Sequence, residues 1–229
     1  MTILPGIDPC PRPLGVTGAI LAGGQSRRLG RDKVTLKLGG KPLALWVAEA
    51  LRPAVADLWL VTNHPQTHLS LGLPLVTDLV PFLGPVGGLA AALFYTRTPW
   101  VLLASADAPF LSPELAAALA GASGRISRPA LVCRSERGLE PLPGVYAARL
   151  LPRVQAFLVK NRSFMDFLER IRPQVWEAEA WRAFDPEGAS FFNLNEPEDL
   201  AQLEGRAAVR NQDAQGISWL PPGKAWKRT

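Results

Sequence analysis

The stretch VTGAILAGGQSRRLGRDK, residues 16–33, joins a mostly apolar run to a loop rich in glycine and basic side chains. Residues 16–22 predict a buried strand. The loop behind this strand holds two adjacent glycines and a set of cations: Gly23, Gly24, Arg27, Arg28 and Lys33. The glycines let the backbone approach an oxyanion closely, and successive N–H groups can then cradle it. Because the cations suit phosphate oxygens, the stretch predicts a phosphate-binding loop.

This loop follows neither of two common phosphate-binding patterns. Lys33 is followed by Val34 and preceded by no glycine, whereas a Walker A motif needs Gly-Lys followed by Ser or Thr. The adjacent Gly23 and Gly24 also do not fit GxGxxG. A flexible basic loop is the alternative interpretation, but its place directly behind a buried strand favours phosphate binding.

Strands and helices alternate downstream of the loop. Apolar runs predict further strands at 57–62, 75–77 and 100–104. Apolar or small residues at helical spacing predict helices at 42–51, 86–95 and 112–120. Ser112 suits the N-cap of the last helix, with Pro113 at its first position. The uninterrupted apolar run 100–104 is typical of the middle of a parallel sheet. The alternation therefore predicts an α/β domain with a mostly parallel sheet.

The second half of the chain is less regular. Short strands are expected at 130–133 and 145–147, and an edge strand behind Pro173 at 175–180. Helices are expected at 150–159, 163–171 and 197–203. We therefore divide the chain into a Pro-rich N-terminal extension 1–15, a nucleotide-binding domain 16–205 and a basic tail 206–229.

The charge of the chain lies mostly in that tail. The net charge is +5, and the tail, with five basic residues and one acid, contributes +4 of it. A solvated tail is the favoured interpretation, and nucleic-acid binding by the folded domain is not expected.

Other residue patterns exclude several classes of protein. The N-terminus lacks a basic start followed by an apolar run, and no stretch of 18 apolar residues predicts a membrane span. Cys10 and Cys133 form no CxxC motif, which indicates a reducing, cytoplasmic location and a structural Cys133 inside a strand. His64 and His68 have Pro65 between them and are expected on a surface loop, so neither zinc binding nor a hydrolase triad is expected.

Polar residues follow the predicted strands at the edge where ligands bind in parallel sheets. Asp107 comes after the run 100–104 and is expected to hold Mg²⁺, with a turn or capping role as the alternative. Asp78 follows 75–77, and either a ligand contact or a simple turn fits it. Asn193 and Asn195 alternate around Leu194 and face one side of an extended segment. Asn195 alone could instead cap the helix behind it.

Several motifs together resemble the MobA-like molybdenum cofactor guanylyltransferase family. They are LAGGQSRRLGRDK (21–33), GPVGGLAAAL (84–93), ASADAPFL (104–111), EPLPGVY (140–146) and FFNLNEPEDL (191–200). The resemblance covers about Thr17–Leu203 and implies a Rossmann-like three-layer α/β sandwich. It also implies a Mg²⁺-dependent transfer of GMP from GTP to molybdopterin with release of pyrophosphate. One departure is Gly87, where the family usually has alanine.

The resemblance also implies roles for individual residues. Residues on the nucleotide would be Leu21, Ala22, Gly23, Gly24, Lys33, Asn63 and Asp78. Asp107 would bind Mg²⁺, and Asn193 and Asn195 would lie on the pterin side. Because an acceptor phosphate needs no general base, catalysis would rest on charge neutralisation by Lys33, Asp107 with its Mg²⁺, and Arg27 or Arg28.

Three other functions stay open on the sequence alone. A cytidylyltransferase acting on the same pterin and a sugar-phosphate nucleotidylyltransferase would share the fold and a similar loop. A non-catalytic nucleotide-binding regulator is the alternative from a different class. Because pterin cofactors are labile, a molybdoenzyme or a cofactor-insertion factor is a reasonable partner for hand-over of the product.

Overall fold

A computed structural model describes residues 15–22 and 33–194. Seven strands form one sheet in the order β5-β4-β1-β6-β8-β7-β9. Their bounds are β1 (Val16–Leu21), β4 (Asp57–Val61), β5 (Leu75–Val76), β6 (Trp100–Ser105), β7 (Ala130–Ser135), β8 (Gly138–Ala147) and β9 (Gln174–Trp176). Within this sheet β8 alone runs against its neighbours, so the sheet is mostly parallel, as the sequence predicted.

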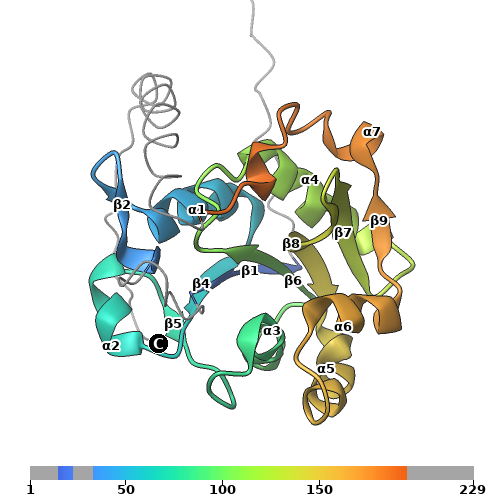
Figure 1. Cartoon of the computed structure of the whole chain (residues 1–229), viewed down its shortest axis with the longest axis horizontal. Helices are drawn as coiled ribbons and strands as arrows, with labels where there is room; N and C mark the ends of the chain where they lie inside the picture. Colours follow the sequence, from blue (N-terminus) through green and yellow to red (C-terminus); the bar gives the residue numbers. More distant parts are fainter. Residues whose placement is uncertain (1–14, 23–32, 195–229) are drawn as a thin grey trace, which may run out of the picture.

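Helices cover both faces of the sheet and give three layers (Figure 1). The helices are α1 (Leu43–Leu51), α2 (Pro65–His68), α3 (Gly84–Tyr95), α4 (Pro113–Ala122), α5 (Leu151–Leu158), α6 (Phe164–Ile171) and α7 (Ala178–Trp181). One face packs against α1 and α4, and the other packs against α3, α5 and α6. The predicted Rossmann-like three-layer sandwich is therefore confirmed.

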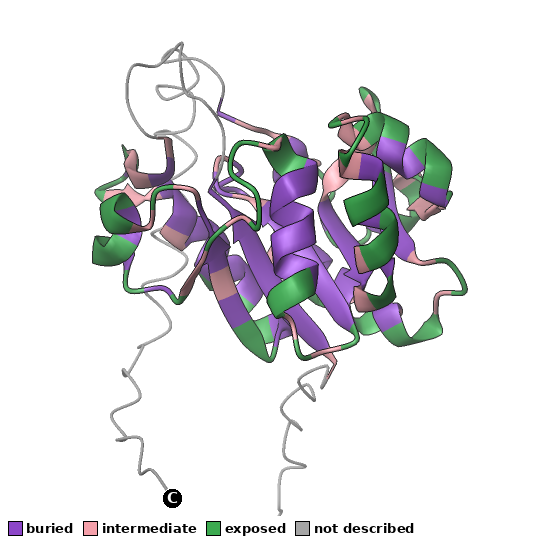
Figure 2. Ribbon diagram, turned by 90° about the horizontal axis from the view of Figure 1, so that it is seen from below, coloured by how far each residue is buried: buried purple, intermediate pink, exposed green. Residues whose placement is uncertain are grey.

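The alternation of side chains along β6 explains why both faces need a helical layer. Leu102 and Ala104 belong to the cluster on the α1 and α4 side, whereas Val101 and Leu103 belong to the cluster on the α3 side. Successive strand residues point to opposite faces, so a central strand that is apolar throughout must be covered twice. Figure 2 shows the result, with buried residues concentrated in the strands and in the helix faces against them.

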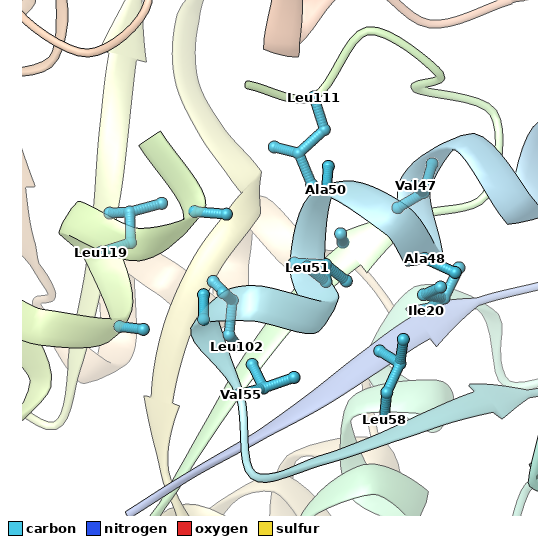
Figure 3. Close-up of a cluster of buried hydrophobic side chains, with 14 of the residues drawn as sticks. Ile20, Val47, Ala48, Ala50, Leu51, Val55, Leu58, Leu102, Leu111 and Leu119 are labelled. Atoms are coloured by element: carbon cyan, nitrogen blue, oxygen red, sulfur yellow. The ribbon is translucent and has the colours of Figure 1, made fainter. Parts of the chain in front are cut away.

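The core on the α1 and α4 side joins the central strands to both helices. Figure 3 shows Ile20 and Leu102 from the sheet together with Leu51 of α1 and Leu119 of α4. All four side chains are fully buried. Truncating one of them to alanine removes buried apolar surface and leaves a cavity, which typically costs about 2–5 kcal/mol of folding free energy.

Shorter elements complete the described chain. A two-stranded hairpin pairs β2 (Lys37–Leu38) with β3 (Lys41–Pro42). Single 3-10 turns occur at Lys33–Thr35, Arg52–Ala54, Leu69–Leu71, Ser123–Arg125, Ala148–Leu150 and Ala189–Phe191. The predicted N-cap of α4 is confirmed, because Ser112 Oγ accepts a hydrogen bond from Leu115 N at 3.1 Å.

The strand β8 starts earlier than the sequence predicted. It begins at Gly138 rather than Val145. The additional residues include Pro141 and Pro143 and lie in an irregular part of the β7–β8 pairing. Leu131 pairs with Val145, and the next pairing joins Cys133 to Glu140. Prolines are tolerated at such irregularities, where they interrupt no regular ladder hydrogen bond.

Two further predictions, for the strand 175–180 and for His68, were wrong. The expected edge strand 175–180 ends at Trp176, and α7 follows it so that Trp181 is buried and donates a hydrogen bond to Arg134 O at 2.9 Å. His68 is buried rather than on a surface loop. The short helix α2 turns its ring inward, where Nδ1 lies 2.8 Å from Thr62 Oγ1. The expected helix 197–203 lies outside the described residues.

Candidate active site

The carboxyl ends of β1, β4 and β6 meet at one edge of the sheet. The Leu21 carbonyl accepts a hydrogen bond from Ala106 N at 3.0 Å, and Ala22 N donates to Val61 O at 2.8 Å. These bonds hold the residues that follow all three strands side by side. The predicted phosphate loop leaves this edge after Ala22 and returns at Lys33. Its four predicted contacts Gly23, Gly24, Arg27 and Arg28 lie outside the described residues.

Lys33 and Asp107 form one polar pair at this edge. Lys33 Nζ lies 3.8 Å from Asp107 Oδ2, and both side chains are largely shielded from solvent. Ser105 Oγ donates a hydrogen bond to Asp107 Oδ1 at 2.5 Å. The carboxylate is therefore fixed by the end of β6 and faces the ammonium of Lys33. Two residues that the sequence placed in one site are close in space.

Leu194, at the C-terminal end of the described residues, contacts this pair through its main chain. Lys33 Nζ donates to Leu194 O at 2.6 Å, and Leu194 N donates to Asp107 O at 2.9 Å. Asn193 precedes this contact and is half-buried. Asn193 is thus the residue directly before the one that contacts the Lys33–Asp107 pair, while Asn195 lies outside the described residues.

Buried and partly buried hydrogen bonds hold the segment before Leu194 in place. Asp185 accepts bonds from Ala189 N at 3.1 Å and from Ser190 N at 2.9 Å. Arg137 donates to the carbonyl of Phe191, whose ring packs edge-on against Trp181 at a centroid distance of 4.9 Å. The chain just before Asn193 is therefore anchored to the rest of the domain.

Asn63 and Asp78 form a second polar pair on the other side of β1. They follow β4 and β5, and Asn63 Nδ2 donates to Asp78 Oδ2 at 2.8 Å. Burial raises the pKa of Asp78 above its usual value of 3.8, and the hydrogen bond from Asn63 opposes that rise. The pair offers acceptor oxygens in a partly desolvated place, which suits the N–H groups of a polar heterocycle.

The glycines at the start of α3 allow the helix to approach β1 closely. A Cβ atom on Gly88 would lie 2.7 Å from Leu21 Cδ2, and one on Gly87 would lie 2.7 Å from Leu83 Cβ. The same Gly87 position is 3.8 Å from Asp78 Oδ2. The glycines therefore pack against protein, and their predicted approach to a ligand stays a prediction.

The metal-binding potential of this edge rests on a single carboxylate. Within residues 15–22 and 33–194 there is no group of three or more His, Cys, Asp or Glu side chains that could hold a metal ion. Asp107 fits the other common arrangement, in which Mg²⁺ takes one or two carboxylates and completes its shell with substrate phosphates and water. Its place beside Lys33 suits a negatively charged substrate.

Cys133 lies in the core of the described chain. Cys133 is fully buried, and burial, with Glu140 and Asp185 nearby, raises the pKa of its thiol to about 12. The predicted structural role of Cys133 fits this position. None of the described helices has the length and apolar character needed to cross a membrane.

Sequence reasoning missed two contributors to this edge. Ser105 could have been found, because it stands two residues before Asp107 at the end of a predicted strand. The Leu194 carbonyl gave no signal, because a main-chain atom has no residue type and its partner Lys33 is 161 residues away.

The chain matches one protein family and individual relatives over most of its length. Residues 18–175 match the family described as the MobA-like NTP transferase domain. A probable molybdenum cofactor guanylyltransferase of Pelotomaculum thermopropionicum is 33% identical over 208 residues, which cover 90% of this chain and 99% of the relative. A molybdenum cofactor guanylyltransferase of Yersinia pseudotuberculosis is 32% identical over 188 residues, covering 80% and 92%.

A solved structure agrees with the sequence relatives. Molybdopterin-guanine dinucleotide biosynthesis protein A from Archaeoglobus fulgidus superposes with a TM-score of 0.75 at 29% sequence identity. The match covers 84% of this chain and 99% of that protein. The similarity therefore extends over most of the fold.

Proposed function

Because the chain belongs to the MobA-like NTP transferase family, we propose that it is a molybdenum cofactor guanylyltransferase. It transfers GMP from GTP to molybdopterin and releases pyrophosphate. The single observation that links this function to a site is the Lys33–Asp107 pair. The pair lies at the carboxyl edge of the sheet, next to the loop that begins after β1. Such an edge is where open α/β sheets bind nucleotides.

The reaction needs positioning and charge neutralisation more than proton transfer. A terminal phosphate oxygen of molybdopterin attacks the α-phosphorus of GTP, and the bond from that phosphorus to the β-phosphate oxygen breaks. The second pKa of such a phosphate is about 6, so the nucleophile is already ionised near neutral pH. The lack of a required base fits the side chains nearest the Asp107 carboxylate, which are Lys33 and Ser105.

In this proposal Lys33 neutralises charge on the α-phosphate and on the departing pyrophosphate, together with Arg27 or Arg28. Asp107 would hold Mg²⁺, which when bound supplies positive charge to phosphate oxygens. Ser105 keeps the Asp107 carboxylate in one orientation by its 2.5 Å hydrogen bond. Leu21, Ala22, Gly23 and Gly24 would offer backbone contacts to the nucleotide.

The Asn63–Asp78 pair would select the base. Guanine carries two adjacent N–H donors on its Watson–Crick edge, and a carboxylate accepts both. Cytosine lacks that pair of donors, so a cytidylyltransferase would need a different arrangement here. Asn193 and Asn195 would contact the pterin of the acceptor. We also propose a cytoplasmic location and hand-over of the product to a molybdoenzyme or insertion factor.

Nucleotide selectivity is the decisive experiment. Calorimetry in the presence of Mg²⁺ should show tighter binding of GTP than of CTP, ATP or UTP, and pyrophosphate should appear only when molybdopterin is added to GTP. A preference for CTP would instead assign the cytidylyl transfer. Binding of GTP without pyrophosphate release in the presence of molybdopterin would favour the non-catalytic regulator.

A further inference from the structure

Phe82 has an unusual backbone for an aromatic residue at the rim of the site. Its φ is +63°, in the left-handed region that L side chains adopt at an energetic cost, and 57% of its surface is exposed. It lies in the loop between β5 and α3, four residues after Asp78. A loop that holds a large apolar ring toward solvent in a strained conformation gains little stability from it, and such strain is concentrated at ligand sites.

His64 lies beside the Phe82 ring. The two ring centroids are 6.0 Å apart, and the ring planes are tilted by 49°. His64 is exposed and follows Asn63 directly, while its own N–H donates to Thr62 Oγ1 at 2.9 Å. The loops after β4 and β5 are therefore joined twice, by the Asn63–Asp78 hydrogen bond and by the His64–Phe82 ring contact.

We infer that Phe82, with His64 beside it, forms the wall on which the base of the nucleotide stacks. The inference rests on the proposed function and adds a stacking residue to it. A planar heterocycle needs two kinds of contact, hydrogen bonds at its polar edge and apolar contact at its face. The Asn63–Asp78 pair supplies the first and the neighbouring rings supply the second, since an aromatic side chain stacks on any base.

Phe94 provides a matched comparison in the same part of the chain. It is also largely exposed, at 53%, but it lies near the C-terminal end of α3 and so at the opposite end of that helix from Gly84. Its ring packs edge-on against Tyr95 at a centroid distance of 5.1 Å. Its backbone is helical. The two phenylalanines thus differ in backbone strain and in distance from the polar pair, not in exposure.

Calorimetry on four variants tests the inference. Phe82→Leu removes the ring and keeps an apolar side chain, and it should bind GTP with Mg²⁺ about tenfold more weakly than the unmodified chain. Phe82→Tyr keeps a ring and should bind within about twofold, as should Phe94→Leu. Phe82→Gly relieves the strain at φ +63° and should unfold at no lower temperature while still losing affinity for GTP.

Inorganic tripolyphosphate separates stacking from a general effect on the loop. It carries the phosphates but no base, so Phe82→Leu should bind it as tightly as the unmodified chain does. Equal loss of affinity for GTP and tripolyphosphate would overturn the inference and assign Phe82 a purely structural role. Unchanged GTP binding by Phe82→Leu would overturn it while leaving the proposed function intact. Failure of the unmodified chain to bind any nucleotide would overturn both.

Discussion

Asp107 and Asp78 follow strands of the same sheet at the same edge, yet their surroundings differ. Asp107 lies 3.8 Å from the Lys33 ammonium and accepts a short bond from Ser105. Asp78 has a neutral amide partner, Asn63, and burial raises its pKa. The Asp107 carboxylate lies beside a cation, whereas the Asp78 carboxylate lies in a partly buried place that suits a neutral hydrogen-bond donor. Position at a strand end is therefore not enough to assign a role to an aspartate, because the neighbouring side chains determine which ligand the carboxylate suits.

Removing either member of the charged pair is expected to have the largest effect. Asp107→Ala and Lys33→Ala should each lower kcat/KM by at least about 100-fold, which corresponds to about 2.7 kcal/mol of lost transition-state stabilisation. The reason is that Lys33→Ala removes a positive charge that neutralises the triphosphate, whereas Asp107→Ala removes the proposed ligand of the Mg²⁺ that would do so. The rate of pyrophosphate release with GTP and molybdopterin measures this loss of kcat/KM.

Lys41→Ala is the matched control for that experiment. Lys41 pairs with Glu49 at 2.7 Å on the hairpin and helix beside the site, so the same charge is lost from an outer surface. Its turnover should stay within about twofold, because an exposed ion pair contributes little. Near-normal turnover by Asp107→Ala would remove the distinction between the two aspartates.

Asp78→Asn is expected to act on base selection and to a smaller extent. Replacing the carboxylate by an amide removes one of the acceptors for the guanine N–H donors, so GTP affinity should fall about tenfold. Affinity for CTP should change less, and calorimetry with both nucleotides measures the ratio. Asp57→Asn gives the same change of charge at the opposite end of β4, where the side chain is exposed, and should leave the ratio unchanged.

Ser105→Ala tests how far orientation of Asp107 matters. The variant loses the 2.5 Å hydrogen bond to Asp107 Oδ1 but keeps the carboxylate and Lys33. We expect kcat to fall by about tenfold or less, with little change in the affinity for GTP. Steady-state kinetics separate the two quantities. A loss as large as that of Asp107→Ala would mean that Ser105 does more than orient its neighbour.

The smallest expected effect concerns stability and pH. Below the usual Asp pKa of 3.8 the Asp78 carboxyl is protonated in the folded and unfolded chain, so its ionisation costs the fold nothing. As pH rises, the unfolded chain ionises first, and the penalty grows until pH passes the raised pKa of the folded state. Asp78→Asn lacks this penalty.

The stability advantage of Asp78→Asn should therefore increase from about pH 4 toward about pH 7. Urea unfolding of both proteins at the two pH values measures it. An advantage that is constant with pH would mean that loss of charge in the folded site is not the cause.

Particular residues show how far the sequence alone could predict the molecule. The apolar strands and the helix periodicity were enough for an α/β domain with a mostly parallel sheet and for placing Lys33 and Asp107 at one edge, whereas the three layers were implied by the family resemblance. The roles of Lys33 and Asp107 in catalysis stay predictions, as do those of Asn63, Asp78 and Asn193. The burial of His68 was missed because a one-turn helix has too few residues to show a period. The start of β8 was missed because prolines normally argue against a strand.

The main-chain contacts of Leu194 have a consequence for how the enzyme is made. Its N–H and its carbonyl bind Asp107 and Lys33 respectively, across 161 residues in the case of Lys33. On a ribosome, the sheet strands all emerge before residue 194 does. A nascent chain therefore forms most of its fold first and makes the main-chain contacts to Lys33 and Asp107 last, so that truncated products ending before residue 194 lack those two contacts.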